Sequence, residues 1–372
     1  MPDALMVTSS FLPGRGGIES YLSELCALLK PRVAVMAPAE RDGKRLPTDL
    51  GYRTIAGPGS MLVPDKRTLE AVTRAAEDLG VQRILFGTPW PLALLGPQLK
   101  RRGYSYASTA LGSELFVPAA TPVIRKHLRA ALAQADLLLP MSAFTETKLR
   151  SLLPKDALPE IEVMRARVDL ERFHPDVDTS RIRTRLGLAP EAKVILSFGR
   201  LVARKGAHRL IAALPKIARA FPEARLVVAG TGPKEKSLRR MARGSGGRVM
   251  FAGRVSDEDA PALFATADVF AFPVVDRWFG LDTEGLGVVL LEAAACETPC
   301  ITGQAGGSIE AVEHDSTGLI VDAADEDALA DALISILGDP AMAARMGKAG
   351  RAFVSSRYAP GYLPASLLRW LD

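Results

Sequence analysis

Apolar and polar residues alternate in blocks along the whole chain. Short apolar runs of strand length are separated by longer segments in which apolar residues return every three or four positions, the spacing of a helix buried on one face. Strands that alternate with such helices predict parallel βαβ units. In the first half the strand-like runs are 4–9, 32–37, 83–86, 104–108 and 136–140, and the helical segments include 19–29, 69–79 and 124–133.

The alternation breaks near residues 161–163, passes through a polar stretch to Arg183, and then restarts. New strand-like runs follow at 194–198, 225–229, 248–251, 269–274, 299–302 and 318–321. We therefore predict an α/β protein of two doubly wound, Rossmann-like domains, 1–168 and 176–356. Ligands of such sheets bind beyond the carboxyl ends of the strands, so we expect a cleft between the domains. The last segment, 357–372, is expected to form a helix that returns to the first domain.

Size and composition agree with two globular domains. The chain has 372 residues, of which 48% are hydrophobic and 24% charged, and no apolar run approaches the length of a membrane span. The first apolar run starts like a strand, without a basic segment before it, so we expect no signal peptide and a cytoplasmic protein. Three cysteines suit neither a disulfide framework nor a zinc site and are expected in the core: Cys26, Cys296 and Cys300.

The net charge of +5 is unevenly spread, with cations at 100–102 and at 125–129. The second group lies beside Val123, Ile124 and Leu128. A solvated helix face is the favoured interpretation. The alternative is weak docking to anionic lipid, at about 1 kcal/mol for each Lys or Arg near the surface, on the inner face of the cell membrane. Nucleic acid is not expected as a partner, because no recognition motif accompanies the charge.

Four strand-to-helix loops are rich in glycine: 12–19, 197–206, 230–233 and 304–310. Glycines there let backbone N–H groups approach a phosphate at a helix N-terminus. The second loop also carries Arg200, Arg204 and Lys205, and arginine can bind phosphate oxygens through two hydrogen bonds. Surface charge alone would not require glycines on both sides of these cations, so we favour a phosphate site.

A further glycine-rich stretch, 279–295, runs into a segment of strong helix formers. Glu284 is expected at the mouth of that helix and Glu292 eight residues later, about 12 Å along and on roughly the same face. One interpretation is a ligand with phosphate at the mouth and hydroxyls near Glu292. The other, of equal weight, is an acidic first turn that complements the helix dipole, with Glu292 paired elsewhere. Together the loops suggest a ligand with a pyrophosphate and sugars.

In order and spacing these motifs resemble the retaining glycosyltransferases of family 4, which have the GT-B fold. The similarity rests on Gly-Gly-Ile at 16–18, the Gly-Arg-Leu-Val-x-Arg-Lys-Gly loop at 199–206, Gly-x-Gly-Pro at 230–233, Glu-x7-Glu at 284–292 and Gly-Gly-Ser-x-Glu at 306–310. More narrowly, residues 280–289 are similar to those of actinobacterial phosphatidylinositol mannoside synthases. The resemblance implies transfer of mannose from GDP-mannose to a lipid or glycolipid acceptor, such as a phosphatidylinositol mannoside, by a membrane-associated enzyme.

The resemblance also implies roles for individual residues. Arg200 and Lys205 would hold the departing diphosphate, and Glu284 would position the transferred sugar; these three are the predicted catalytic residues. Glu292 would bind the ribose. The remaining donor contacts that the resemblance implies are made by Gly16, Gly17, Arg254, Val255, Gly285, Leu286 and Gly287.

The implied reaction proceeds with retention, driven by stabilisation of the leaving diphosphate, and needs no acid/base pair, no cofactor and no metal. The Asp176-Val-Asp178 string is interpreted as a solvated linker. Two positions depart from the family pattern: Leu111 stands where a histidine beside the donor sugar is usual, and Arg167 where a glycine is usual. The alternatives are a UDP-sugar donor with another acceptor, a GT-B-fold nucleotide-sugar epimerase, and a non-catalytic binder. The sequence leaves the acceptor and the oligomeric state open.

Overall fold

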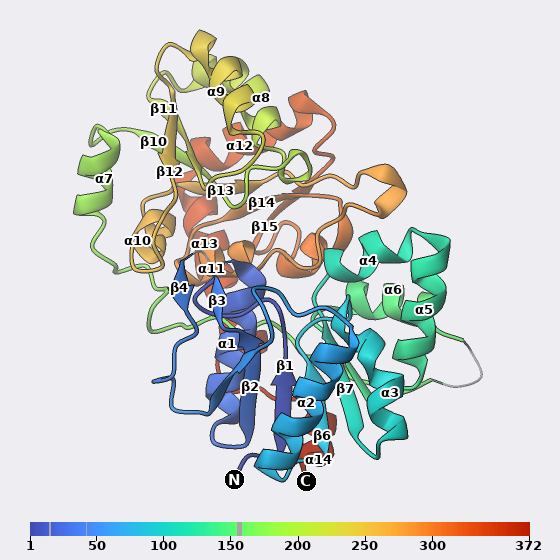
Figure 1. Ribbon diagram of the computed structural model, residues 1–372. Coiled ribbons are helices and arrows are strands. Elements are labelled where there is room, and N and C mark those ends of the chain that lie inside the picture. The colour runs from blue at the N-terminus through green and yellow to red at the C-terminus, as the bar shows by residue number, and fades with distance from the viewer. Residues whose placement is uncertain (15, 42, 155–157) are drawn as a thin grey trace. The chain divides into compact units, whose positions relative to one another are not determined.

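The computed structural model describes residues 1–14, 16–41, 43–154 and 158–372. These residues form two compact units (Figure 1). Unit 1 comprises Met1–Ala166 together with Gly361–Asp372, and unit 2 comprises Arg167–Pro360. Each unit has its own parallel sheet and its own hydrophobic core.

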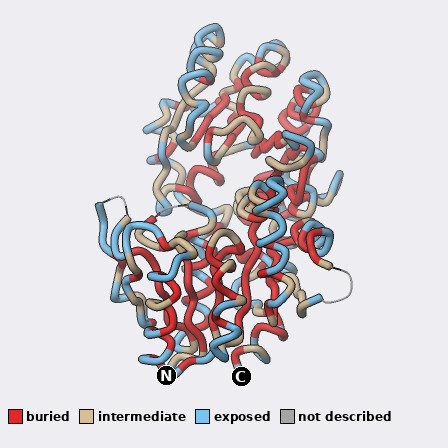
Figure 2. Tube along the Cα trace, turned by 45° about the vertical axis from the view of Figure 1, so that its right-hand side comes forward, coloured by how far each residue is buried: buried red, intermediate tan, exposed pale blue. Residues whose placement is uncertain are grey.

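The sheet of unit 1 has seven strands in the order β5-β2-β1-β6-β7-β8-β9, and every pair is parallel. β1, β2 and β8 are buried along their whole length (Figure 2), as expected for a parallel sheet with helices on both faces. The strands are β1 Ala4–Val7, β2 Val33–Pro38, β5 Thr54–Gly57, β6 Arg83–Phe86, β7 Ser105–Ala110, β8 Leu137–Pro140 and β9 Glu160–Ile161.

Two helices of unit 1, α2 and α6, begin at residues whose side chains cap them, Asp65 and Ser142. Asp65 accepts a hydrogen bond from the Thr68 backbone at the start of α2, and Gly80 ends that helix in the left-handed conformation. A short antiparallel hairpin, β3 Glu40–Arg41 with β4 Lys44–Arg45, lies apart from the main sheet. The helices are α1 Gly17–Leu29, α2 Lys66–Leu79, η1 Leu92–Leu95, α3 Gly96–Arg101, α4 Ser113–Ala119, α5 Pro122–Ala133, α6 Ala143–Leu152 and α14 Ala365–Leu371.

The C-terminal helix α14 belongs to unit 1, which confirms the predicted return of the chain. It packs beside β8 and is fixed by polar contacts at both ends. The backbone N–H of Ser366 donates to Glu162 at 2.9 Å, and the indole N–H of Trp370 donates to Ser105 at 2.8 Å.

The sheet of unit 2 has six parallel strands in the order β12-β11-β10-β13-β14-β15. The chain starts in the middle with β10, builds towards one edge through β11 and β12, and then builds towards the other. β10 and β13 therefore flank the point where the strand order reverses. The strands are β10 Lys193–Phe198, β11 Ala224–Ala229, β12 Val249–Gly253, β13 Val269–Phe272, β14 Cys300–Gly303 and β15 Gly318–Val321.

Helices also cover the sheet of unit 2, and buried leucines of α8 and α12 line its core. The polar stretch that was predicted to extend to Arg183 runs into a short helix, α7, which ends at Gly187 in the left-handed conformation. The helices are α7 Ser180–Leu186, η2 Ala203–Lys205, α8 Ala207–Ala220, α9 Glu235–Met241, η3 Ala242–Ser245, α10 Ala260–Ala265, η4 Trp278–Gly280, α11 Val288–Ala295, η5 Gly306–Ala311, α12 Glu326–Gly338 and α13 Pro340–Arg357.

Two expectations from composition can be compared with the structure. All three cysteines are buried, as predicted, and burial raises the pKa of Cys296 to about 12, so its thiol stays protonated near neutral pH. Within the described ranges, no helix combines the length and the apolar character that crossing a bilayer requires.

Candidate active site

The candidate active site lies in unit 2, at the carboxyl ends of β10 and β13. Three glycine-containing loops meet there: 199–206 after β10, 273–287 after β13, and the segment that leads into η5 after β14. In open α/β sheets, ligands bind at the point where the strand order reverses. The residues of these three loops are therefore the candidates for ligand binding.

The loop after β10 lies directly against the end of β13. Gly206 has φ 76°, and a Cβ there would come within 2.0 Å of the carbonyl oxygen of Pro273, so only glycine fits. The backbone N–H of Val275 donates to the carbonyl of Arg204 at 3.0 Å. α8 begins immediately afterwards at Ala207, without an acidic residue in its first turn. Its N-terminal N–H groups thus give this edge of the sheet a positive end.

Two cations and two carboxylates meet between these loops. Lys205 Nζ lies 2.8 Å from Glu284 Oε2, and Arg204 contacts Glu284 at 3.5 Å and Asp282 at 3.4 Å. The four side chains are between 12% and 20% exposed. We call Arg204, Lys205, Asp282 and Glu284 the ion-pair cluster. Glu284 Oε2 therefore receives both cations at ion-pair distances.

The electrostatics of Lys205 follow from its surroundings. Burial lowers the pKa of its ammonium group, and neighbouring Arg204 lowers it further, while Glu284 partly offsets both effects. The ammonium also lies 4.4 Å from the centre of the Phe272 ring, a favourable cation–π distance. The Lys205 ammonium can bind a multiply charged anion if that anion displaces the Glu284 carboxylate from it.

The prediction that Glu284 and Glu292 share one face of a helix is wrong. α11 begins only at Val288, so Glu284 lies in the preceding loop. Gly280 and Gly287 have φ of 81° and 79°, left-handed values that a right-handed helix cannot contain. The loop is instead held by η5: the N–H of Gly307 donates to the carbonyl of Glu284 at 2.8 Å.

Most other predicted donor contacts of unit 2 lie at the carboxyl ends of its strands. Arg200 follows β10, and Arg254 follows β12; both are exposed. Val255 and Glu292 are half-buried, and Glu292 projects from α11. The buried predicted residues are Gly285, Leu286 and Gly287. The structure thus brings Lys205 and Glu284 into contact, whereas the roles of the others stay predictions.

The predicted residues of unit 1 lie on different loops. Gly16 and Gly17 are exposed at the start of α1, and the neighbouring Arg15 lies outside the described residues. Leu111 follows β7 and is only 6% exposed. The backbone N–H groups of Leu111 and Gly112 both donate to the Glu114 carboxylate. Burial raises the pKa of Glu114, although these hydrogen bonds oppose the rise.

Sequence reasoning missed Asp282 and Phe272, and it placed Arg204 among the phosphate-binding cations of its loop without a carboxylate partner. Arg204 and Asp282 are 78 positions apart, so their contact depends on the neighbouring positions of β10 and β13 in the sheet. The only local signal was the place of Arg204 beside Lys205. Asp176 and Asp178 are exposed, as expected of a linker, and no group of three potential metal ligands occurs in the described parts of the chain.

Two Rossmann-like units with the ion-pair cluster at a strand-order reversal are typical of glycosyltransferases of the GT-B fold. The family model "Glycosyl transferases group 1" matches residues 178–353. A GDP-mannose-dependent alpha-(1-6)-phosphatidylinositol monomannoside mannosyltransferase of Mycolicibacterium smegmatis is 37% identical, covering 93% of this chain and 92% of that protein. The chain therefore belongs to the group 1 glycosyltransferases, as its motifs predicted.

Further comparisons extend over the full length of the chain. A mannosyltransferase of the same name from Mycobacterium tuberculosis is 36% identical, covering 100% of this chain and 98% of that protein. Among solved structures, the sucrose-phosphate synthase of Thermosynechococcus elongatus has a TM-score of 0.77 at 23% identity, covering 96% and 95% of the two chains. Anabaena HepE in complex with UDP and glucose has a TM-score of 0.79 at 21% identity, covering 96% of each chain. These structures confirm the predicted fold.

Proposed function

We propose that this chain transfers mannose, with retention, from GDP-mannose to a glycolipid of the phosphatidylinositol mannoside kind. One observation carries the proposal: the 37% identity to a mannosyltransferase with that donor and acceptor covers 93% of the chain. The identity therefore includes unit 1 and not only the donor-binding half. The ion-pair cluster supports the same reaction, because its two cations could stabilise the charge of a departing diphosphate.

In this proposal the donor diphosphate lies at the N-terminus of α8. Arg200 and Lys205 bind its oxygens, and the helix end adds partial positive charge. Glu292 receives hydroxyl groups of the ribose, and Arg254 with Val255 flanks the base. Glu284 and the backbone of 285–287 then position the sugar. Gly16 and Gly17 are assigned to the donor on resemblance alone.

The bond between the anomeric carbon and the diphosphate breaks first, and its electron pair leaves on GDP. The acceptor hydroxyl attacks the same face of the sugar, and its proton passes to the departing phosphate oxygen. Lys205 contributes by lowering the energy of the charge that develops on that oxygen. Because these cations meet the charge, we propose that the reaction needs no metal. Treatment with EDTA is expected to leave the rate within about twofold, an effect below 0.5 kcal/mol.

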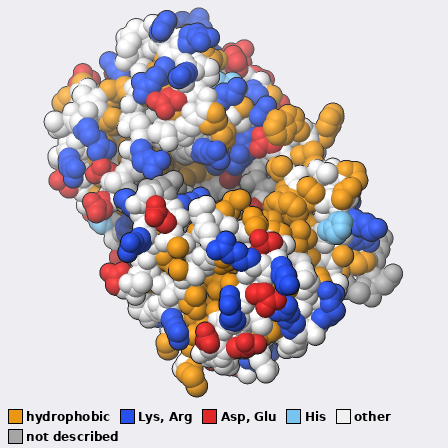
Figure 3. All heavy atoms as spheres, in the orientation of Figure 1, with side chains coloured by type: hydrophobic (Ala, Val, Ile, Leu, Met, Phe, Trp, Pro, Cys, Tyr) orange, Lys and Arg blue, Asp and Glu red, His pale blue; other side chains and the backbone are white. Residues whose placement is uncertain are grey.

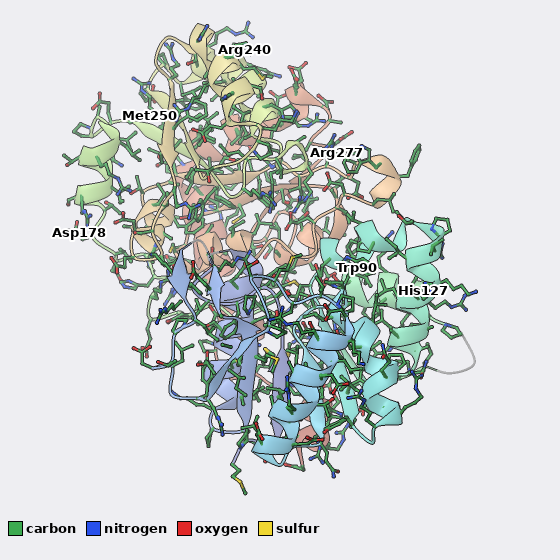
Figure 4. The ribbon with its side chains drawn as sticks, in the orientation of Figure 1. Trp90, His127, Asp178, Arg240, Met250 and Arg277 are labelled. Carbon is green, nitrogen blue, oxygen red and sulfur yellow. The ribbon has the colours of Figure 1, made fainter. Side chains whose placement is uncertain are left out.

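We further propose that unit 1 attaches peripherally to anionic lipid through α4 and α5. Arg125, Lys126 and Arg129 line an open pocket of about 260 Å³ together with Ala120 and Pro122. Val117 and Val123 beside it are 48% and 66% exposed. His127 projects outward from the same helix in Figure 4, and apolar side chains lie beside cations in this region of Figure 3. Apolar groups beside cations suit a surface of anionic headgroups.

A panel of sugar nucleotides tests the donor and the reaction together. GDP-mannose, UDP-glucose and UDP-GlcNAc would each be incubated with phosphatidylinositol monomannoside, and again without any acceptor. Glycolipid product with GDP-mannose alone is the expected result. A preference for a UDP-sugar would refute the mannose assignment. An epimerised nucleotide sugar without acceptor would indicate an epimerase, and tight donor binding without product would indicate a binder.

Vesicle sedimentation tests the membrane surface. The unmodified protein should sediment with vesicles of phosphatidylinositol but not of phosphatidylcholine. The triple variant Arg125→Gln, Lys126→Gln and Arg129→Gln should lose most of this binding, because each cation adds about 1 kcal/mol. A matched control removes three exposed cations from α9 of unit 2: Lys236→Gln, Arg239→Gln and Arg240→Gln. Equal loss in both triple variants would contradict a surface on α5.

A further inference from the structure

A long loop connects β13 to α11, and Glu284 lies near its end. We call residues 276–284 the donor-side loop; Figure 4 labels Arg277 within it. Its base is closed by a short antiparallel pairing, in which the Arg277 N–H donates to the Asp282 carbonyl at 3.0 Å and the Asp282 N–H donates back at 3.2 Å. The Thr283 hydroxyl also donates to Asp276. The position of Glu284 therefore depends on how this base is held.

The tip of the donor-side loop contributes little to fixing the position of Glu284. Trp278 is 61% exposed, and Phe279 is fully exposed. Both have left-handed φ values, 50° and 56°, which non-glycine residues seldom adopt. Since the tip buries so little apolar surface, its packing cannot fix the loop. The restraint has to come from groups at the base and from η5.

Arg204 reaches that base from a different loop. Its Nη1 donates to Asp282 Oδ1 at 3.4 Å, and its Nε lies 3.5 Å from Glu284 Oε2. It thus contacts two of the three carboxylates of the loop, and these two stand two residues apart in the chain. Its own backbone is fixed by the hydrogen bond from Val275 to its carbonyl.

We infer that Arg204 is a positioning residue of the transfer reaction: it holds the donor-side loop so that Glu284 and the backbone of 285–287 keep their places. The inference rests on the proposed function. Lys205 cannot fill this role during the reaction, because the incoming diphosphate competes with Glu284 for its single ammonium group. Arg204 keeps a charge beside Glu284 when that exchange occurs, and its planar fork can serve two carboxylates at once.

A different role would place Arg204 directly on the diphosphate. The two roles differ in what they predict for GDP, which carries the diphosphate but no transferred sugar. If Arg204 bound the diphosphate directly, its substitution would weaken GDP binding and would slow transfer in proportion. If Arg204 is a positioning residue, its substitution should slow transfer while GDP binding stays nearly unchanged. The ratio of these two effects therefore decides between the roles.

The test uses the full chain with Arg204→Gln, Arg204→Lys and Asp282→Asn. Arg204→Gln should lower kcat at least tenfold, while the dissociation constant of GDP changes less than threefold. Arg204→Lys keeps the charge but reaches one carboxylate, so it should fall between Arg204→Gln and the unmodified protein. Adding Asp282→Asn to Arg204→Gln should recover part of the lost kcat, because it removes the charge of a carboxylate that has lost one of its two arginine partners, Arg204 and Arg277. Lys216→Gln, a surface cation paired with Asp327 and Asp331, is the matched control and should change neither quantity.

Several results would overturn the inference. Unchanged kcat in Arg204→Gln would show that the contact is dispensable. A loss of GDP affinity in proportion to kcat would make Arg204 a diphosphate ligand. Should Arg204→Gln not fold, Arg204→Lys and Asp282→Asn carry the same test, and a normal kcat in both would refute the positioning role.

Hydrogen exchange separates this inference from the donor assignment, since it needs no turnover. The amides of Gly280, Leu281 and Asp282 are hydrogen-bonded in the donor-side loop and should exchange at least tenfold faster in Arg204→Gln than in Lys216→Gln. Equal exchange rates would refute the inference even if GDP-mannose is the donor. Faster exchange in a protein that prefers a UDP-sugar would refute only the mannose assignment, and kcat would then be measured with that sugar.

Discussion

The first strand-to-helix turn of each unit invites comparison, because both follow a central strand and both contain glycines. In unit 1 the first turn of α1 contains Glu19, whose carboxylate pairs with Arg41 at 3.1 Å. In unit 2 the first turn of α8 has no acidic residue, and Arg204 and Lys205 precede it. An acidic side chain already satisfies the helix dipole in unit 1, whereas the α8 terminus keeps its positive end. Glycines mark the turn in both units, but the charges differ, and this difference favours the turn of unit 2 as the main site for the diphosphate of the proposed donor.

The largest effect should follow from removing the central cation of this comparison. Lys205→Met roughly keeps the length of the side chain but removes the ammonium, and with it the cation–π contact to Phe272 and the charge for the diphosphate. We expect kcat/KM for transfer to fall about 10²–10³-fold, the usual loss when one preorganised electrostatic contact to a leaving group is deleted. Initial rates at several donor concentrations measure it, with Lys216→Met as the control. A loss below tenfold would show that Arg200 and the helix N-terminus suffice.

A pH profile should reveal the burial of the same ammonium group. Because the pKa of Lys205 is lowered below its ordinary 10.5, the cation is lost at a lower pH than for an exposed lysine. Activity should therefore decline as pH rises through that lowered pKa. Glu284 raises the pKa, so Glu284→Gln should move the decline to a still lower pH. The measurement is kcat/KM against pH for both proteins, and an alkaline decline that moves upward in Glu284→Gln would contradict this assignment.

Much of this arrangement could be predicted from sequence, because local signals carry it. The glycines at 199 and 206 follow a short apolar run, and both have positive φ in the structure. The strand-and-helix rhythm also predicted the central strands, such as β1 and β10. The strands of unit 1 that were missed are the partly buried β5, the two-residue β9 and the two-residue strands β3 and β4 of the hairpin. None of these carries the fully apolar run by which the central strands were predicted.

The geometry of the site could not be predicted, because it depends on contacts between distant segments. The spacing of Glu284 and Glu292 suggested a helix, yet glycines with left-handed φ end that periodicity before Val288. The pairing of Arg204 with Asp282 follows from the neighbouring positions of β10 and β13, which no local pattern encodes. Charge type was therefore predictable, while the choice of partner was not.

Exchanging the charges of the two turns tests the comparison itself, with a moderate expected effect. His208→Glu places a carboxylate in the first turn of α8, as Glu19 stands in α1. We expect GDP to bind about three- to thirtyfold more weakly, since a charge at a helix terminus contributes up to about 2 kcal/mol in partly buried positions. Glu19→Gln in unit 1 should change GDP binding less than twofold. Isothermal titration calorimetry measures the dissociation constant of GDP for both variants. An equal effect of the two substitutions would show that the two turns do not differ in their contribution to GDP binding.

The smallest effect concerns stability in unit 1. Glu114 accepts from the backbone N–H groups of Leu111 and Gly112, so Glu114→Ala leaves two donors without this acceptor and should lower the free energy of unfolding by about 1–3 kcal/mol. Glu114→Gln keeps an acceptor oxygen and should cost less. Burial raises the pKa of Glu114 above its ordinary 4.5, so the stability it contributes is fully present below pH 4.5 and declines as pH rises through the raised value. Denaturant unfolding across that range should show this decline in the unmodified protein relative to Glu114→Gln. The opposite result would be a free energy of unfolding that rises with pH in the unmodified protein relative to Glu114→Gln. It would show that the two hydrogen bonds to the ionised carboxylate outweigh the effect of burial on its pKa.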